Sequence, residues 1–168
     1  PVDVVVIGAG ITGLSAAYHL LEAGRSVVVV DKGTVGCGET GRTTAHLASA
    51  LDDHYALLER MHGRRGARLA AESHAAAIAS IEAIVSAEDI ACEFARVDGY
   101  LFAATPRQQR ELRRELTAAR RAGLEVEAID AAPLPFATGP ALRFAQQAQF
   151  QPLAYLEGLA RAVRKRGG

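Results

Sequence analysis

The sequence has few cysteines, no excess of charge of either sign and no long apolar run. Its two cysteines, Cys37 and Cys92, lie in no CxxC or Cys/His pattern, which argues against a metal centre and favours a reducing cytoplasm over a disulfide framework. The 19 basic and 19 acidic residues cancel, so no general attraction to nucleic acid or to an acidic membrane surface is expected. No apolar run approaches the roughly 18–20 residues that span a bilayer. A strand predicted from residue 2 onward leaves no room for a signal peptide.

Apolar periodicity predicts alternating strands and helices with neither repeats nor low-complexity linkers. A long helical region at 53–89 is expected to be divided near Gly63 and Gly66, and a turn at Val97-Asp98-Gly99 is expected to join two strands. A last helix from residue 152 is expected to bury Leu153, Leu156 and Leu159. Strands are predicted at 2–7, 26–30, 93–96, 99–103, 125–129 and 142–149. Two further helices are predicted: one follows the first strand and ends at about residue 23, and the other spans 106–122.

The first strand leads directly into Gly8-Ala9-Gly10-Ile11-Thr12-Gly13, which opens a helix. In such a turn Gly8 allows the tight bend, Gly10 lets a pyrophosphate approach the backbone, and Gly13 lets the helix pack closely on the strand. The helix N-terminus then offers unpaired N–H groups to phosphates. Asp31 ends the next strand, roughly 20 residues further on, where a carboxylate accepts hydrogen bonds from ribose hydroxyls and disfavours the 2′-phosphate of NADP. Together these features predict a dinucleotide-binding βαβ unit rather than an unrelated glycine-rich turn.

The polar loop at 36–46 distinguishes between the possible dinucleotides. An NAD dehydrogenase has little use for such a loop directly after the ribose-binding acid, whereas an extended FAD molecule needs a second set of contacts along its phosphates and ring. Arg42, Thr43 and Thr44 have side chains suited to hydrogen bonding with phosphate and the flavin edge. The loop therefore favours FAD over NAD.

At this point the sequence resembles the D-amino-acid oxidase/glycine oxidase class of FAD-dependent oxidoreductases over nearly its whole length. The segments that carry the resemblance are VVVIGAGITGLSAAYHL, VVVVDKG, GETGRTTAHL, VDGYLF, RAGLEVE and QPLAYLEGLARAVRKRGG, of which the first and third are the most specific. GRTTAHL followed by LDD is most similar to a bacterial branch that carries a C-terminal Rieske iron–sulfur domain. These residues hold no Cys/His cluster for its iron centre, so such a domain is either absent or lies outside the chain, beyond residue 168.

The resemblance implies a set of cofactor-binding residues. Gly8, Gly10 and Gly13, with Ile11 and Thr12 of the same motif, would hold the pyrophosphate, and Asp31 would hold the ribose. Phosphate or flavin contacts would come from Lys32, Thr40, Arg42, Thr43 and Thr44. His46 would lie near the isoalloxazine ring, or else be a histidine satisfied at the start of a helix. The other histidines show no metal-ligand spacing, so no metal site is expected; they are His19, His54, His62 and His74.

The predicted fold class is α/β, a Rossmann-like FAD/NAD(P)-binding domain with part of an inserted α+β substrate-binding domain. Residues 1–90 are expected to form the FAD-binding part, 91–150 part of the inserted sheet domain, and 151–168 the helix that returns to the first domain. Tyr100, in the inserted sheet, either faces substrate or belongs to the core. A doubly wound sheet needs about five parallel strands and only two are evident, so we expect a truncated domain whose other strands follow residue 168. The start at Pro1 fits the same expectation.

The implied reaction is oxidation of a C–H bond next to the nitrogen of an amino acid or other amine, by hydride transfer to flavin N5 and hydrolysis of the imine. The cofactor supplies the chemistry, and no side chain in this chain is identified as catalytic. The truncation predicts weak or absent FAD binding and no turnover for the chain alone. Two alternatives stay open, an NAD-dependent dehydrogenase domain and a non-catalytic dinucleotide-binding module.

The helix predicted at 106–122 is rich in arginine. Its basic residues face few acids, Glu111 and Glu115, and either form an ordinary solvated surface or dock a partner. They are Arg107, Arg110, Arg113, Arg114, Arg120 and Arg121.

Overall fold

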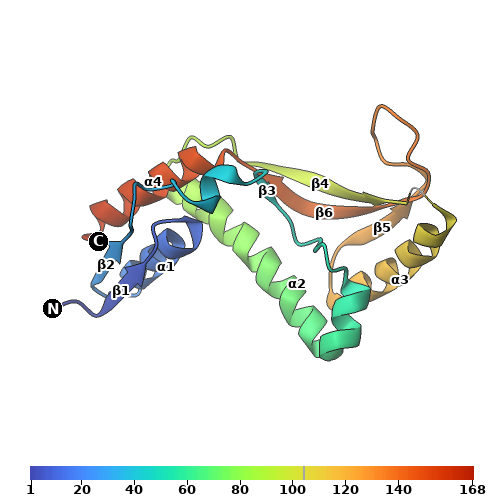
Figure 1. The fold of residues 1–168 in the computed structure, drawn as a ribbon, viewed down its shortest axis with the longest axis horizontal. Helices are drawn as coiled ribbons and strands as arrows, with labels where there is room; N and C mark the ends of the chain where they lie inside the picture. The colour runs from blue at the N-terminus through green and yellow to red at the C-terminus, as the bar shows by residue number, and fades with distance from the viewer. Residues whose placement is uncertain (104) are drawn as a thin grey trace. The chain divides into compact units, whose positions relative to one another are not determined.

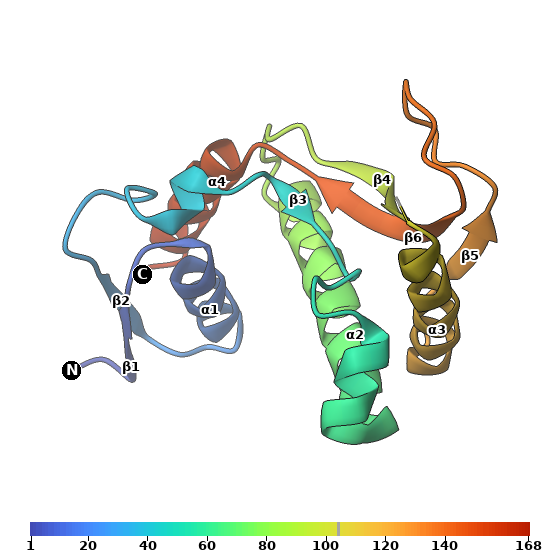
Figure 2. The same cartoon turned by 45° about the vertical axis from the view of Figure 1, so that its right-hand side comes forward.

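The computed structural model describes residues 1–103 and 105–168, which form two compact units (Figures 1 and 2). The first unit comprises Pro1–His46, Ile81–Phe94 and Gln149–Gly168, and the second comprises Leu47–Ser80 and Ala95–Ala148. Two of the divisions, after Phe94 and after Ala148, lie near the expected boundaries at residues 90 and 150. Residues 47–80, which were expected in the first part, group with the second unit. The long helix α2 (Tyr55–Ala87) contributes to both units.

The first unit is built on a βαβ element. Strand β1 (Val4–Ile7) pairs in parallel with β2 (Val27–Val30), and α1 (Ile11–Glu22) connects them. The register joins Val4 to Val27 and Ile7 to Val30. The strands consist only of β-branched residues, which favour parallel pairing, and one face of the pair is exposed at Val5, Ile7, Val28 and Val30. Helix α1 packs against α4 (Pro152–Lys165), so segments from the two ends of the sequence share one core.

Helix α4 buries a continuous face that includes Leu156, Leu159 and Val163. Gly158 lies on this face, where a Cβ atom would come within 2.5 Å of Ile90 Cγ2, so a larger residue would separate α4 from the segment after α2. Leu153 is 43% exposed, and the expectation that it faces inward is wrong.

The second unit contains a four-stranded sheet. Its order is β3-β6-β4, and β5 pairs in antiparallel fashion with β6; the strands are β3 (His46–Leu47), β4 (Ala95–Phe102), β5 (Val126–Ile129) and β6 (Ala141–Gln149). Helix α3 (Pro106–Ala122) contacts β5 and β4 (Figure 2). A core of small and aromatic residues fills this unit, including Tyr55, Leu112, Ala119 and Phe144.

Helices α2 and α3 are joined by a buried carboxylate. Glu115 of α3 is 2% exposed, and its two oxygens accept hydrogen bonds from the backbone N–H groups of Tyr55 (2.8 Å) and Ala56 (2.9 Å). These N–H groups lie in the first turn of α2, where no intrahelical acceptor exists, so Glu115 acts as a remote N-cap. The expectation that Glu115 balances arginines on a solvated helix face is therefore wrong.

Two other local expectations also differ from the structure. The predicted turn at Val97-Asp98-Gly99 does not form, because β4 runs without interruption from Ala95 to Phe102. Within α2 only Gly63, at φ +70°, has a non-helical backbone, and Gly66 does not divide the helix. No helix in the described part of the chain is long and apolar enough to cross a membrane.

Candidate dinucleotide-binding site

The turn between β1 and α1 requires glycine at two positions for different reasons. Gly8 has φ +106°, a conformation that side chains disfavour, and its N–H donates to Val30 O (2.8 Å). Gly13 lies within the first turns of α1, where a Cβ atom would lie 1.9 Å from the Gly8 carbonyl oxygen. The helix can therefore approach the strand only because residue 13 has no side chain.

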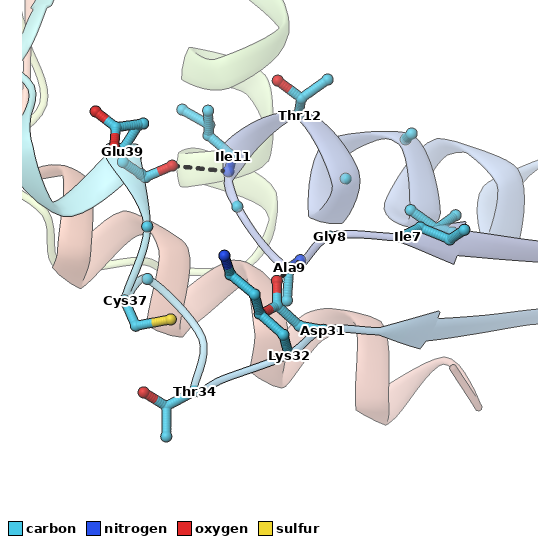
Figure 3. Close-up of a pocket in the computed structure, with 17 residues that line it drawn as sticks. Ile7, Gly8, Ala9, Ile11, Thr12, Asp31, Lys32, Thr34, Cys37 and Glu39 are labelled. Atoms are coloured by element: carbon cyan, nitrogen blue, oxygen red, sulfur yellow. Dashed lines mark hydrogen bonds between the residues drawn. The ribbon is translucent and has the colours of Figure 1, made fainter.

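The N-terminus of α1 is open to a ligand. Its N-cap residue, Gly10, supplies no side-chain hydrogen bond, and the first turn of the helix has no acidic residue. The Ile11 N–H donates to Thr40 Oγ1 (3.2 Å), which brings the loop after β2 across the helix end (dashed line in Figure 3). Since Thr40 accepts through its oxygen, its own proton is available to a phosphate oxygen at the same place.

Asp31 fixes the geometry on the other side of the turn. Its Oδ2 accepts from the Ala9 N–H (2.7 Å), and its Oδ1 accepts from the Gly33 N–H (2.9 Å). These backbone hydrogen bonds, first that of Ala9 and then that of Gly33, lower the pKa of the Asp31 carboxyl below its ordinary value. Each carboxylate oxygen keeps a further lone pair, so an ionised Asp31 can hold the turn and accept from ribose hydroxyls together.

These residues surround a hollow of about 490 Å³. Eight residues predicted from the sequence line it: Gly8, Gly10, Ile11, Thr12, Gly13, Asp31, Lys32 and Thr40. Figure 3 shows the Lys32 side chain extending between Cys37 and the Gly8–Ala9 turn. Thr34, Cys37 and Glu39 also line the hollow. The sequence assigned no role to these three residues, although Cys37 and Glu39 belong to the polar loop at 36–46.

Two further predicted residues line a second, smaller hollow in the first unit. Thr44 and His46, together with Glu93, Phe150 and other residues, line a space with a volume of about 210 Å³. His46 lies exposed in β3, so the alternative that it is satisfied at a helix start is wrong. Ala45 and Glu93 both have positive φ, +68° and +53°, which is a strained conformation for residues with side chains. Sequence patterns gave no indication of Glu93.

Arg42 and Thr43 line neither of these hollows in the described chain. Arg42 ends a short 3₁₀ helix, η1 (Glu39–Arg42), and Arg42 Nη1 lies 3.4 Å from Glu39 Oε1 with both side chains largely exposed. Tyr100 lies half-buried in β4 of the second unit. The structure thus brings together the glycine motif at 8–13, Asp31 and Thr40 around the first hollow, and Arg42 and Thr43 do not line it.

The first hollow fits the adenosine diphosphate end of a dinucleotide. A Cβ atom on Gly8 would have no neighbour within 4 Å, so the space over this turn is open, whereas Gly10 faces Thr40 Oγ1 at 3.2 Å. Phosphates would meet the N–H groups of α1 and the Lys32 ammonium, and the ribose would meet Asp31. The donors and acceptors therefore suit a pyrophosphate flanked by a ribose.

The chain belongs to the FAD dependent oxidoreductase family, known as DAO, which it matches over residues 3–168. It is 36% identical over 166 residues to the Bacillus subtilis (strain 168) protein YhfW, which is named as a Rieske 2Fe-2S iron-sulfur protein. This match covers 99% of the chain and 33% of YhfW. A shorter match, 40% identical over 67 residues, joins 40% of the chain to 16% of the gamma-glutamylputrescine oxidoreductase of Escherichia coli (strain K12).

Solved structures show the same α/β fold. Glycine oxidase from Geobacillus kaustophilus has a TM-score of 0.78 at 21% identity, with 99% of this chain and 45% of that protein covered. L-amino acid deaminase from Proteus vulgaris has a TM-score of 0.76 at 20% identity, with 99% and 38% covered. The chain thus spans about a third of YhfW and less than half of these two structures. The sequence-based assignments of the family and of the α/β fold class are confirmed.

Proposed function

We propose that this chain forms the FAD-binding part of an oxidoreductase that oxidises the C–N bond of an amino acid or another amine. The observation that carries the proposal is the hollow between β1, α1 and the loop after β2. There Asp31, the glycine turn and the N-terminus of α1, which its own N-cap residue Gly10 does not cap, present acceptor and donor groups in the order of a ribose and a pyrophosphate. Membership of an FAD-dependent family supports FAD rather than NAD as the dinucleotide.

In this proposal the residues of the chain bind and orient the cofactor. The N–H groups of Gly10 to Gly13 and the Lys32 ammonium bind the pyrophosphate, while Asp31 accepts from the ribose and keeps the turn in place. Thr44 and His46, around the second hollow, contact the flavin end. The flavin supplies the redox chemistry by accepting a hydride from the carbon that bears the nitrogen.

The substrate class is proposed from the relatives. Glycine oxidase, L-amino acid deaminase and gamma-glutamylputrescine oxidoreductase are all named for compounds with an amine nitrogen. We propose a substrate of this class, with the second unit forming part of the substrate-binding domain. The name of YhfW supports a Rieske domain as a partner, carried outside this chain.

An absorbance titration tests the FAD assignment directly. The purified chain is mixed with FAD and passed through a sizing column, and the visible flavin bands are followed in the protein fractions. Flavin that elutes with the protein supports the proposal. A colourless chain calls for the same test on a polypeptide of the length of the relatives; absence of flavin there too, with reduction of a test acceptor by NADH, would favour a nicotinamide dehydrogenase. Bound flavin without turnover of any amine would favour a non-catalytic module.

An Asp31→Asn variant tests the residue on which the proposal depends. The amide nitrogen of asparagine cannot accept from Ala9 or Gly33, so the turn loses one charge-assisted hydrogen bond. We expect FAD affinity to fall about tenfold or more. The lost charge-assisted hydrogen bond is worth about 1.4 kcal/mol or more, and 1.4 kcal/mol corresponds to a factor of ten in affinity. Asp130→Asn makes the same charge change at an exposed site of the second unit. If both variants bind FAD equally well, the assignment of Asp31 fails.

A further inference from the structure

The second unit has a pair of adjoining hollows between the first turns of α2 and helix α3, which we call the arginine groove. The first hollow of the groove is lined by Arg60 of α2 and by Arg113, Arg114 and Arg121 of α3, around a space of about 590 Å³. The neighbouring hollow, about 610 Å³, shares Arg60 and Arg114 and ends at Asp52 and Asp53. Four arginines from two helices therefore border one surface depression.

In the first hollow of the groove Glu59 is the acid that faces the four arginines, whereas Asp52, Asp53 and Glu111 line the neighbouring hollow. Glu59 accepts from Arg121 (2.8 Å) and pairs with Arg64 (3.1 Å), and these contacts, chiefly that with Arg121, lower its pKa. Glu111 lies 3.3 Å from Arg107, which is outside the groove. Glu115 is buried under the N-terminus of α2.

Three arginines of the groove consequently remain uncompensated. Among residues 1–103 and 105–168, Arg60, Arg113 and Arg114 form no ion pair and no side-chain hydrogen bond. Like charges that share one depression repel each other, and a bound anion would relieve that repulsion.

The walls of the groove are held in place without any ligand. The Glu115 carboxylate joins α3 to the first turn of α2 at Tyr55 and Ala56, and Ala56 itself lines the groove. Helix α3 begins at a capping box formed by Thr105 and Gln108 and ends at Gly123 in the left-handed conformation. The backbone positions of the arginines are thus set in advance, which lowers the entropic cost of binding.

The type of basic residue indicates the type of ligand. Apart from its histidines, every basic residue of the second unit is arginine, since the two lysines of the chain, Lys32 and Lys165, belong to the first unit. Guanidinium groups bind phosphate oxygens in pairs of parallel hydrogen bonds, which an ammonium group cannot do. We propose that the arginine groove binds the phosphate group of a phosphorylated small molecule through Arg60, Arg113 and Arg114. This site is separate from the dinucleotide-binding hollow and does not depend on its assignment.

The experiment measures the thermal unfolding midpoint of the protein with added inorganic phosphate, pyrophosphate or a sugar phosphate, at constant ionic strength set with chloride. Three versions are compared: the unaltered protein, the double variant Arg60→Gln/Arg114→Gln, and the control Arg65→Gln/Arg68→Gln, which removes the same charge from exposed positions of α2 outside the groove. We expect the midpoint to rise with phosphate compounds in the unaltered protein and in the control. In the groove variant the concentration needed should increase about tenfold, as expected for the loss of two guanidinium–phosphate contacts.

The source of the phosphate follows from which compound acts at the lowest concentration. A sugar phosphate that acts below inorganic phosphate indicates an ester ligand, whereas the reverse order indicates free phosphate. Because phosphate can also bind at the N-terminus of α1, the comparison between the two double variants is decisive. An equal response of these variants, or an equal response to chloride alone, overturns the proposal. The groove variant should also be no less stable than the control without phosphate, since it removes repulsion.

Discussion

At the scale of single residues, Gly13 is the position where one methyl group decides the structure. A Cβ atom there would lie 1.9 Å from the Gly8 carbonyl oxygen, and neither backbone segment can move without separating α1 from β1. We expect Gly13→Ala to destabilise the protein by about 3 kcal/mol or more, the range of severe overpacking. Chemical denaturation followed by circular dichroism measures the change.

Gly8→Ala serves as the comparison for Gly13→Ala. Gly8 has φ +106°, but a Cβ atom on it would meet no atom within 4 Å, so only backbone strain of about 1–2 kcal/mol is expected. An equal loss of stability in both variants would show that backbone strain, and not the clash with the carbonyl oxygen, is the cause.

The residues of the candidate site differ in how far the sequence predicts them. Gly8, Gly10, Gly13 and Asp31 were predictable because their spacing follows from the geometry of a βαβ turn. Arg42 has suitable chemistry but pairs with Glu39, since a local i,i+3 contact was available in η1. Which way a loop side chain points depends on such short contacts, and no periodic pattern records them.

At the scale of secondary-structure elements, the start of α2 depends on a residue 59 positions away from Ala56. Removing Glu115 leaves the N–H groups of Tyr55 and Ala56 without an acceptor in a buried setting. We therefore expect Glu115→Ala to cost about 2–3 kcal/mol, whereas Glu111→Ala, at an exposed ion pair on the same helix, should cost about 0.5 kcal/mol or less. Urea denaturation of the two variants gives both values. Equal values would mean that the hydrogen bonds of Glu115 contribute nothing to stability.

The strand β4 shows why a local turn signal fails. Asp98-Gly99 is typical of a hairpin turn, yet Arg143 of β6 donates to Asp98 (2.7 Å) and to Glu127 of β5 (2.7 Å). Gly99 lies against Gln147, whose Cγ would be 3.1 Å from an added Cβ atom. Cross-strand partners thus use both residues within a continuous strand. The helices were easier to predict, because α3 carries its own start and stop residues.

At the scale of the whole molecule, contacts between distant parts of the sequence hold the first unit together and make it sensitive to acid. Arg166, after α4, pairs with Glu88, which also accepts from the Tyr18 hydroxyl (3.0 Å). The hydrogen bond from Arg166, followed by that from Tyr18, lowers the pKa of Glu88 below its ordinary 4.5. The resulting stability is fully present above pH 4.5 and is lost as the pH falls through the lower pKa of the folded state.

A Glu88→Gln variant tests this pH dependence. At neutral pH it should be less stable than the unaltered protein by about 1–2 kcal/mol, the range for hydrogen bonds to charged groups. The difference should shrink as the pH falls below 4.5, where Glu88 itself becomes protonated. Thermal unfolding at several pH values measures it, with Glu157→Gln as the control, because Glu157 is 77% exposed. A difference that stays constant down to the acid limit would contradict the role given to Glu88.

The division into two units is also a property of the whole chain, and it was the least predictable from sequence. The expected boundary at residue 90 lies near the division after Phe94, but α2, which was expected in the first part as a whole, passes from one unit to the other at residue 80. A helix that is continuous in sequence shows the same periodicity on both sides of such a boundary. Tertiary contacts divide it: Tyr55, Ala56 and Glu59 bind side chains of α3, whereas Glu88, directly after α2, pairs with Arg166 after α4.

The βαβ element leaves one face of its sheet open, and this face yields a further prediction. Val5 pairs in register with Val28 and Ile7 with Val30, and all four are exposed, by 56%, 40%, 87% and 45% respectively. Parallel sheets are normally covered on both faces, and the chain spans only 33% of YhfW. We therefore expect the 168-residue chain alone to self-associate through this apolar face.

Val5→Thr/Val28→Thr should reduce the association measured by sedimentation, while Met61→Gln, at an isolated exposed residue of the second unit, should not. A polypeptide of the length of YhfW should not associate in this way, because further segments would cover the face. Association of the long form that is equally sensitive to the valine substitutions would instead identify the face as an interface between copies.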